Sequence, residues 1–267
     1  MLKDITLGQF FPGNSLAHRL DPRTKILLTV LYIVALFCAK WFASYGVVAA
    51  VLIAGIKISG VAPRALVKGL KPILFIICFT AVLNLLYTPG EPLASFWIFT
   101  ITKEGVLTAL FMVLRIVMLI MGTFLLTYTT SPIALTDGLE TLLRPLKKIK
   151  VPVHELAMIM SIALRMIPTL IEETDKIMSA QKARGADFET GSLFQRAKAL
   201  VPILVPLFIS AFRRADELAV AMECRCYHGD AGRTKLHVLH YQMRDYLVLA
   251  AYAAVLACVV ALARFGL

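Results

Sequence analysis

Two segments of the chain carry the same short pattern, and each ends in an arginine. They are Asp175–Arg184 and Asp216–Arg225, and both read Asp-x4-Ala-x3-Arg. On a helix, residues four positions apart share a face, so Ala180 and Ala221 would each lie beside the arginine of its own segment. A rigid, planar guanidinium next to a small residue suits a close, bidentate contact with a carboxylate on another surface. The repeat therefore predicts a protein that grips two similar partners.

Small residues surround both arginines, in the runs Ala183-Arg184-Gly185 and Cys224-Arg225-Cys226. Each run is expected at a helix C-terminus, where Gly185 is well placed to end the first helix. A simpler interpretation is that each arginine only interacts with free carbonyls and the helix dipole, worth a few tenths of a kcal/mol. That role requires no repeated spacing, so the duplication favours docking. The residues expected to support the two docking runs are Ala180, Ala221 and Glu223.

The second run also contains thiols that could suggest a metal site. Cys224, Cys226 and His228 form a C-x-C-x-H cluster. Structural zinc sites usually have C-x2–4-C spacing and a fourth ligand, which this sequence does not provide at suitable spacing. We therefore expect no metal.

Motifs for energy conversion or catalysis are missing from the sequence. It has no G-x4-G-K-[ST] phosphate loop, no G-x-S-x-G and no H-E-x-x-H. Arg115 falls within an apolar run, where a charge usually marks function or a buried partner, but no acidic residue in another span pairs with it. We expect no cofactor and a chain that is not itself an enzyme, and the sequence assigns no role to Arg115.

Composition places the chain in a membrane. Apolar residues make up 59% of its 267 residues, and the mean hydropathy is +0.77, whereas a soluble domain is about 45–50% apolar. The net charge of +11 does not indicate nucleic-acid binding, because the basic residues are not interleaved with aromatic ones. They cluster between apolar runs, as topology signals do. The expected fold is an all-α, polytopic membrane protein.

About five transmembrane helices are predicted from the apolar runs. They are Ile26–Phe42, Tyr45–Ile58, Ile73–Tyr87, Val106–Tyr128 and Tyr246–Leu262. Basic residues concentrate before the first run and between the second and third, which places those segments, and the N-terminus, in the cytoplasm. Residues 1–128 then form a membrane domain of four spans, residues 129–244 a cytoplasmic domain, and residues 245–267 a last span with an external C-terminus.

The middle block is ambiguous by hydropathy. Residues 156–171 and 200–212 are strongly apolar, but Arg165 interrupts the first segment and Pro202 and Pro206 interrupt the second. We interpret both as parts of long amphipathic helices at the membrane surface, one from about Val153 to Ala183 and about 45 Å long, the other ending near Tyr227. Two extra crossings would leave the termini unchanged, so crossing remains an alternative.

Six separated motifs together resemble one known family. They are Pro12-Gly13-Asn14-Ser15, His18-Arg19-Leu20-Asp21-Pro22-Arg23-Thr24-Lys25, Thr130-Ser131-Pro132, Ala163-Leu164-Arg165-Met166-Ile167-Pro168, Ala180-Gln181-Lys182-Ala183-Arg184-Gly185 and Ala221-Met222-Glu223-Cys224-Arg225. In this order they resemble the CbiQ-like family, the transmembrane T components of energy-coupling factor (ECF) transporters, which import vitamins or metal ions.

The resemblance implies a scaffold that joins two cytoplasmic ATP-binding subunits to a membrane-embedded S component that binds substrate. It implies two coupling helices whose final arginines, Arg184 and Arg225, each insert into one ATP-binding subunit. Cys224 and Cys226 stand where the family has Ala and Gly. The side chain of Cys226 is expected to hinder close approach of a partner to the backbone there. The residues expected to contact the S component are Pro202, Pro206 and Leu207.

Two other functions remain as alternatives at this point. A self-sufficient secondary transporter would need a polar site at the midplane, generally between inverted repeats. A membrane-embedded enzyme would need a catalytic constellation that the sequence lacks. The transported substrate cannot be read from this chain, because the resemblance places the substrate-binding subunit on another chain.

Overall fold

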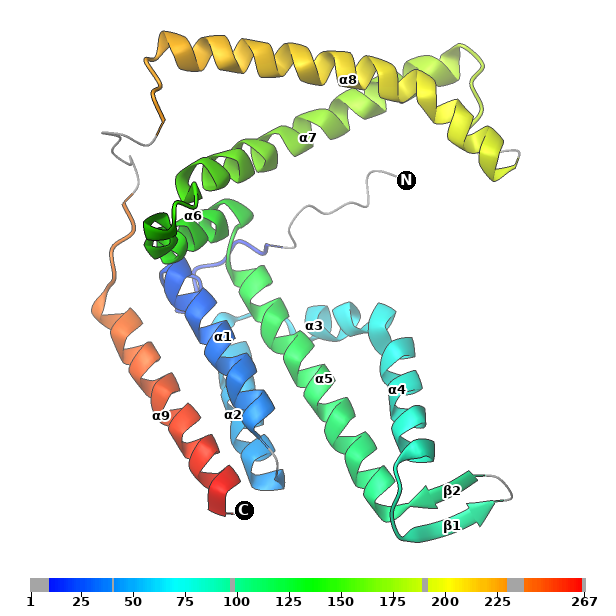
Figure 1. Cartoon of the computed structure of the whole chain (residues 1–267), viewed down its shortest axis with the longest axis vertical. Coiled ribbons are helices and arrows are strands. Elements are labelled where there is room, and N and C mark those ends of the chain that lie inside the picture. Colours follow the sequence, from blue (N-terminus) through cyan, green and yellow to red (C-terminus); the bar gives the residue numbers. More distant parts are fainter. Residues whose placement is uncertain (1–9, 40, 97–98, 189–191, 230–237, 266–267) are drawn as a thin grey trace. The chain divides into compact units, whose positions relative to one another are not determined.

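The computed structural model describes residues 10–39, 41–96, 99–188, 192–229 and 238–265. These residues are almost entirely helical, with one short antiparallel hairpin (Figure 1). The chain divides into two compact units. One, here called the bundle unit, contains Gly8–Leu139 and Leu239–Leu267, and the other, the two-helix unit, contains Glu140–Val238.

Most of the shorter elements lie in the bundle unit. In chain order they are α1 (Pro22–Cys38), α2 (Phe42–Ser59), α3 (Pro63–Leu70), the 3-10 turn η2 (Lys71–Ile73), α4 (Leu74–Tyr87), β1 (Pro92–Phe96), β2 (Phe99–Thr102), α5 (Lys103–Thr129) and α9 (Met243–Phe265), with α6 (Pro132–Leu143) leading out of the unit. Helices α1, α2, α5 and α9 lie side by side (Figure 1).

Local signals set the start of α1. The Asp21 carboxylate accepts the backbone N–H of Arg23 at 2.9 Å, and Pro22 occupies the first turn, where its missing N–H costs nothing. The helix therefore begins four residues before the predicted Ile26, because its polar first turn is helical although it is not apolar. Hydropathy identifies only the apolar part of such a helix and not its polar first turn.

Two elements between α2 and α5 were not predicted. Helix α3 and the hairpin β1–β2 are short, and neither has the length or periodicity that identifies an element from sequence. Contacts at the base of the hairpin order it: the Thr102 hydroxyl accepts the N–H of Gly105 at 3.1 Å, and the Glu104 carboxylate accepts the N–H of Glu91 at 2.8 Å. Helix α4 begins at Leu74, close to the predicted Ile73.

A buried cluster joins α1, α2, α5 and α9. Its members are Tyr32, Ala35, Leu36, Ala39, Tyr45, Val48, Leu52, Met118 and Val259. The Tyr32 hydroxyl donates to the Met118 carbonyl at 2.9 Å, which satisfies a polar group inside this cluster. Many large apolar side chains outside it are exposed, including Phe75 and Phe79 of α4. A hydrocarbon environment would cover such surfaces.

The two-helix unit consists mainly of α7 (Val153–Ala183) and α8 (Leu193–Cys224), preceded by the 3-10 turn η3 (Arg144–Ile149). Helix α7 has the predicted bounds, and α8 ends three residues before the predicted Tyr227. Both helices continue through internal prolines, Pro168 in α7 and Pro202 and Pro206 in α8. The start of α8 is a capping box, in which the side chains of Ser192 and Gln195 each bond the other's backbone.

Six helical segments of the described chain are long and apolar enough to cross a membrane. They are Phe42–Ser59, Pro63–Tyr87, Lys103–Thr129, Val153–Ala183, Phe194–Cys224 and Met243–Arg264. This confirms an all-α, polytopic membrane protein. Length and composition admit α7 and α8 among the candidates, whereas α1, at 17 residues, is slightly shorter than the six. The surface position predicted for α7 and α8 stays a prediction.

Candidate functional site

Helix α7 ends in a Schellman motif centred on Arg184. The N–H of Gly185 donates to the Lys182 carbonyl at 3.0 Å, and the N–H of Ala186 donates to the Gln181 carbonyl at 3.0 Å. Gly185 has φ +88°, the left-handed conformation that this motif requires. The backbone carbonyls at the helix end are therefore satisfied without the arginine side chain. Arg184 is exposed and free to contact another surface.

Helix α8 ends in the same motif, with Arg225 at the equivalent position. The N–H of Cys226 donates to the Glu223 carbonyl at 2.8 Å, and the N–H of Tyr227 donates to the Met222 carbonyl at 3.1 Å. Cys226 takes the place of Gly185 and has φ +56°. A non-glycine residue thus adopts the left-handed conformation, at a cost of roughly 1–2 kcal/mol. The duplicated sequence pattern produces duplicated backbone geometry.

The surroundings of both arginines are open. The flanking and supporting residues of the two runs are all exposed: Ala180, Ala183, Gly185, Ala221, Glu223, Cys224 and Cys226. Within the described residues, neither guanidinium has a hydrogen-bond or ion-pair partner in this chain. A surface approaching either helix end would meet a guanidinium flanked by small or thiol side chains.

An ion pair fixes the point where α7 and α8 contact. Arg214 Nη2 donates to Glu173 Oε2 at 2.9 Å. These residues are 41 positions apart, the same offset that separates Arg184 from Arg225. Each partner of the ion pair therefore lies eleven residues before its arginine, about 16 Å along the helix. Figure 1 shows the two helices crossing, with their C-terminal ends far apart.

Large apolar side chains cover part of α8. The residues predicted to contact an S component are exposed at Pro202 and Pro206 and half-buried at Leu207. A more extensive exposed stripe has helical spacing and consists of Val201, Val205, Phe208 and Phe212. The sequence indicated this apolar range but not which face remains exposed, because that depends on where α7 packs.

The C-x-C-x-H residues lie at the end of α8 and just beyond it. Cys224 and Cys226 are free, exposed thiols, and His228 Nδ1 donates to the Cys226 carbonyl at 2.7 Å. Among the described residues, no group of three His, Cys, Asp or Glu side chains is arranged to hold a metal ion. These thiols belong to the helix end rather than to a separate site.

Arg115 acquires partners that the sequence could not supply. Its Nε donates to the Tyr45 hydroxyl at 2.9 Å, and Nη2 lies 3.5 Å from the Ala39 carbonyl at the end of α1. The guanidinium also lies 5.7 Å from the centre of the Phe37 ring. Among the described residues no carboxylate pairs with Arg115, and its partners are instead a phenol, a carbonyl and an aromatic face.

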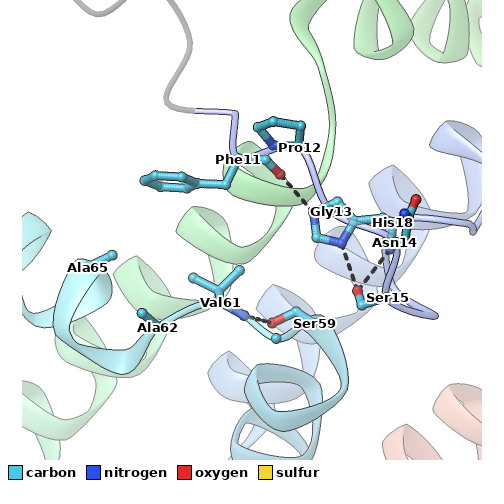
Figure 2. A pocket seen from close by; sticks show the side chains of 11 residues that line it. Phe11, Pro12, Gly13, Asn14, Ser15, His18, Ser59, Val61, Ala62 and Ala65 are labelled. Atoms are coloured by element: carbon cyan, nitrogen blue, oxygen red, sulfur yellow. Dashed lines mark hydrogen bonds between the residues drawn. The ribbon is translucent and has the colours of Figure 1, made fainter.

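The motif around Pro12 to His18 forms one wall of a pocket of about 390 Å³, shown in Figure 2. His18 Nε2 donates to the Phe11 carbonyl at 2.9 Å, so in the neutral ring Nδ1 accepts the Ser15 hydroxyl at 2.7 Å. A Cβ on Gly13 would lie 2.9 Å from His18 Cε1, closer than side chains approach. Hydrogen bonds within the motif therefore stabilise its conformation beside the turn between α2 and α3. Both ring nitrogens of His18 are engaged in these hydrogen bonds.

The following motif, at Asp21 to Lys25, ties α1 to α9. Asp245 accepts the N–H of Asp21 at 2.9 Å and the N–H of Gln242 at 2.8 Å. Arg23 pairs with Asp21 at 3.2 Å and lies over the Tyr241 ring at 4.4 Å. The sequence gave no signal for Asp245 or Tyr241, because both lie more than 200 residues further along the chain. The motif is therefore a buried joint between α1 and α9.

The long apolar helices define a multi-pass integral membrane protein. A family model described as CbiQ, cobalt transport protein, matches residues 13–237. The chain belongs to this family, as the transmembrane component of an energy-coupling factor transporter, and its relatives carry that name.

Three relatives are each named energy-coupling factor transporter transmembrane protein EcfT. That of Clostridium kluyveri is 55% identical over 266 residues, covering 99% of this chain and 98% of the relative. That of Acidaminococcus fermentans is 54% identical over 247 residues, covering 92% of each. That of Bacillus subtilis is 49% identical over 250 residues, covering 93% of this chain and 94% of the relative. The similarity extends over nearly the whole chain, and the name that these relatives share is that of a transporter subunit.

Proposed function

We propose that this chain is a non-catalytic scaffold that couples two cytoplasmic ATP-binding subunits to a substrate-binding S component in the membrane. The observation that carries the proposal is the pair of matching helix ends. Arg184 and Arg225 occupy equivalent positions in two Schellman motifs, both are exposed, and both lie the same distance from the crossing ion pair. Two equal docking ends suit two similar subunits.

The crossing supplies a way to transmit movement. When the ATP-binding subunits close on ATP, the ends of α7 and α8 move relative to one another. Because the helices contact near Glu173 and Arg214 and extend about 16 Å beyond that point, this movement changes the angle between them. The apolar stripe of α8 then carries the change to the S component, which tilts and releases a vitamin or metal ion inward.

The proposal places the two-helix unit in the cytoplasm. Residues 129–244 form the coupling domain, residues 1–128 and 245–267 the membrane domain, the N-terminus is cytoplasmic and the C-terminus external. Clusters of basic residues around the start of α1 and between α2 and α4 support this orientation.

Charge reversal at both helix ends tests the proposal. Truncating one partner of a buried interfacial ion pair costs about 2–5 kcal/mol, so Arg184→Glu with Arg225→Glu should abolish co-purification of the ATP-binding subunits while the chain still folds in the membrane. The matched control reverses Arg165 and Arg213, exposed arginines on the same helices away from their ends. Undiminished co-purification of the first variant would disprove docking through these arginines. Substrate uptake by the purified chain alone would instead establish a self-sufficient transporter.

A further inference from the structure

A groove of about 570 Å³ runs along the bundle unit between helices α1, α2, α5 and α9. Its lining is almost entirely apolar, and its charged members are Lys25 and Arg244. Leu16, Ile58 and Leu247 are each more than half exposed, so the groove is open toward the surroundings of the protein.

The groove occupies only one half of the helix bundle. Its lining comes from the segment before α1, the first parts of α1 and α9 and the last parts of α2 and α5, which meet at one end of the bundle. Toward the other end, fully buried side chains such as Leu36, Val48 and Val259 fill the same space. Along α9 the groove extends from Arg244 to Val255, about 16 Å. One leaflet of the hydrocarbon core is about 15 Å deep, half of the full thickness.

Two cations stand at the end of the groove where α1 and α9 begin. Arg244 is exposed, and its guanidinium bonds only the neighbouring Gln242 side chain, at 2.6 Å, within the described chain. Lys25 Nζ donates to the Thr129 carbonyl at 2.9 Å and to the His18 carbonyl at 3.2 Å. None of the described residues that line the groove is acidic. The groove therefore has an apolar body and a cationic mouth.

Two carboxylates lie near this mouth but are already engaged. Asp245 is 2% exposed and accepts two backbone N–H groups, while Asp21 is 8% exposed and pairs with Arg23. Neither lines the groove. They hold the ends of α1 and α9 together, and their negative charge acts on the neighbouring Lys25, which leaves Arg244 as the uncompensated cation of the mouth.

We propose that this groove binds one anionic phospholipid, with an acyl chain along Leu247, Ala251 and Val255 and the phosphate at Arg244 and Lys25. Basic pockets between membrane helices bind anionic headgroups in this way. The match between groove depth and a single leaflet sets the position of the headgroup, and Arg244 selects its charge. The bound lipid fills the space between α2 and α9 that side chains leave open.

Native mass spectrometry of the full chain, purified with the subunits that accompany it, tests the site. Phosphatidylglycerol and phosphatidylethanolamine with the same acyl chains are added in equal amounts. The wild type should retain one phosphatidylglycerol, in about fivefold preference over phosphatidylethanolamine. Arg244→Gln should lose this preference, whereas Arg264→Gln, the same change at the far end of α9, should keep it.

A second pair of variants tests the acyl chain. Ala251→Phe fills the groove and should abolish retention of both lipids, whereas Ala253→Phe, on the exposed opposite face of α9, should leave it unchanged. An unaltered gel-filtration profile establishes that each variant is folded. Equal retention of the two lipids by the wild type, or full retention by Ala251→Phe, would overturn the proposal. Loss of an accompanying membrane subunit from Ala251→Phe, with lipid retention intact, would assign the groove to a protein helix instead.

Discussion

At the scale of single residues, each proposed docking arginine is followed by a residue in the left-handed conformation. Gly185 and Cys226 both have positive φ, and this reversal of the backbone ends the helix while leaving the arginine exposed beside it. Nothing lies within 4 Å of a Cβ built on Gly185, so only backbone strain separates glycine from other residues there. The two positions therefore provide opposite tests of the same conformation.

Gly185→Ala should weaken the end of α7 by about 1 kcal/mol, because alanine is strained at φ +88°. Cys226→Gly should stabilise the end of α8, by a smaller amount, since the greater freedom of glycine in the unfolded chain offsets part of the relief. Hydrogen exchange of the amides of Gly185 and Ala186, and of residues 226 and 227, measures both effects. Faster exchange in Cys226→Gly would contradict the assigned conformation.

Arg115 illustrates a charge whose partners are neutral. Because a hydrogen bond from a charged donor contributes about 1.5–3 kcal/mol, Arg115→Gln and Tyr45→Phe should each lower the thermal unfolding midpoint. The double variant should be no worse than the more damaging single one, because both changes remove the same contact. Thermal unfolding followed by gel filtration provides the measurement. Strictly additive losses would show that the two side chains stabilise the protein independently.

At the scale of helices, the sequence repeat explains where α7 and α8 meet. The ion pair joins Glu173 to Arg214, and a shift of 41 residues superimposes the first on the second just as it superimposes Arg184 on Arg225. Equivalent positions of two similar helices thus contact each other, which makes the segments beyond the crossing equal in length. The proposed coupling depends on this equality.

Exchanging the two charges of the Glu173–Arg214 ion pair should preserve the crossing of α7 and α8. Glu173→Arg or Arg214→Glu alone places like charges together, which should broaden the distance distribution between spin labels at positions 180 and 221. The double exchange restores an opposite pair and should restore the wild-type distribution. Glu172→Arg is the control, since this exposed neighbour takes no part in the ion pair. If both single variants keep the wild-type distribution, the ion pair does not fix the crossing.

Some elements could be predicted from the sequence more completely than others. The bounds of α7 were predicted in full because a long periodic segment ends at a glycine, and the start of α1 was missed because its first turn is polar. The proposed docking residues were chosen from local spacing and stay a prediction. The partners of Arg115 and the joint at Asp245 could not be predicted, since each pairs residues that only the folded chain brings together.

At the scale of the whole molecule, the chain combines two kinds of helix with similar hydropathy. Helices α1, α2 and α5 supply most of the buried core, to which α9 adds Val259, whereas among the described side chains of α8 only Ile203 is buried and the apolar stripe is exposed. Helix α7 also carries Arg165 on an exposed position within its apolar part. A charge at the centre of a membrane helix costs about 2.5–3.5 kcal/mol. These features favour a surface position for both helices over two crossings.

Labelling from each side of the membrane decides between these topologies. In a variant lacking the native cysteines, a single cysteine at Ser192 reports the segment between α7 and α8, and one at Arg225 reports the end of α8. If neither helix crosses, a membrane-impermeant maleimide should label both positions from the cytoplasmic side, and a cysteine at Arg264 only from outside. If both helices cross, position 192 would react from outside while position 225 stays cytoplasmic. That result would leave one docking arginine, Arg184, near the external end of α7, where no cytoplasmic subunit could reach it.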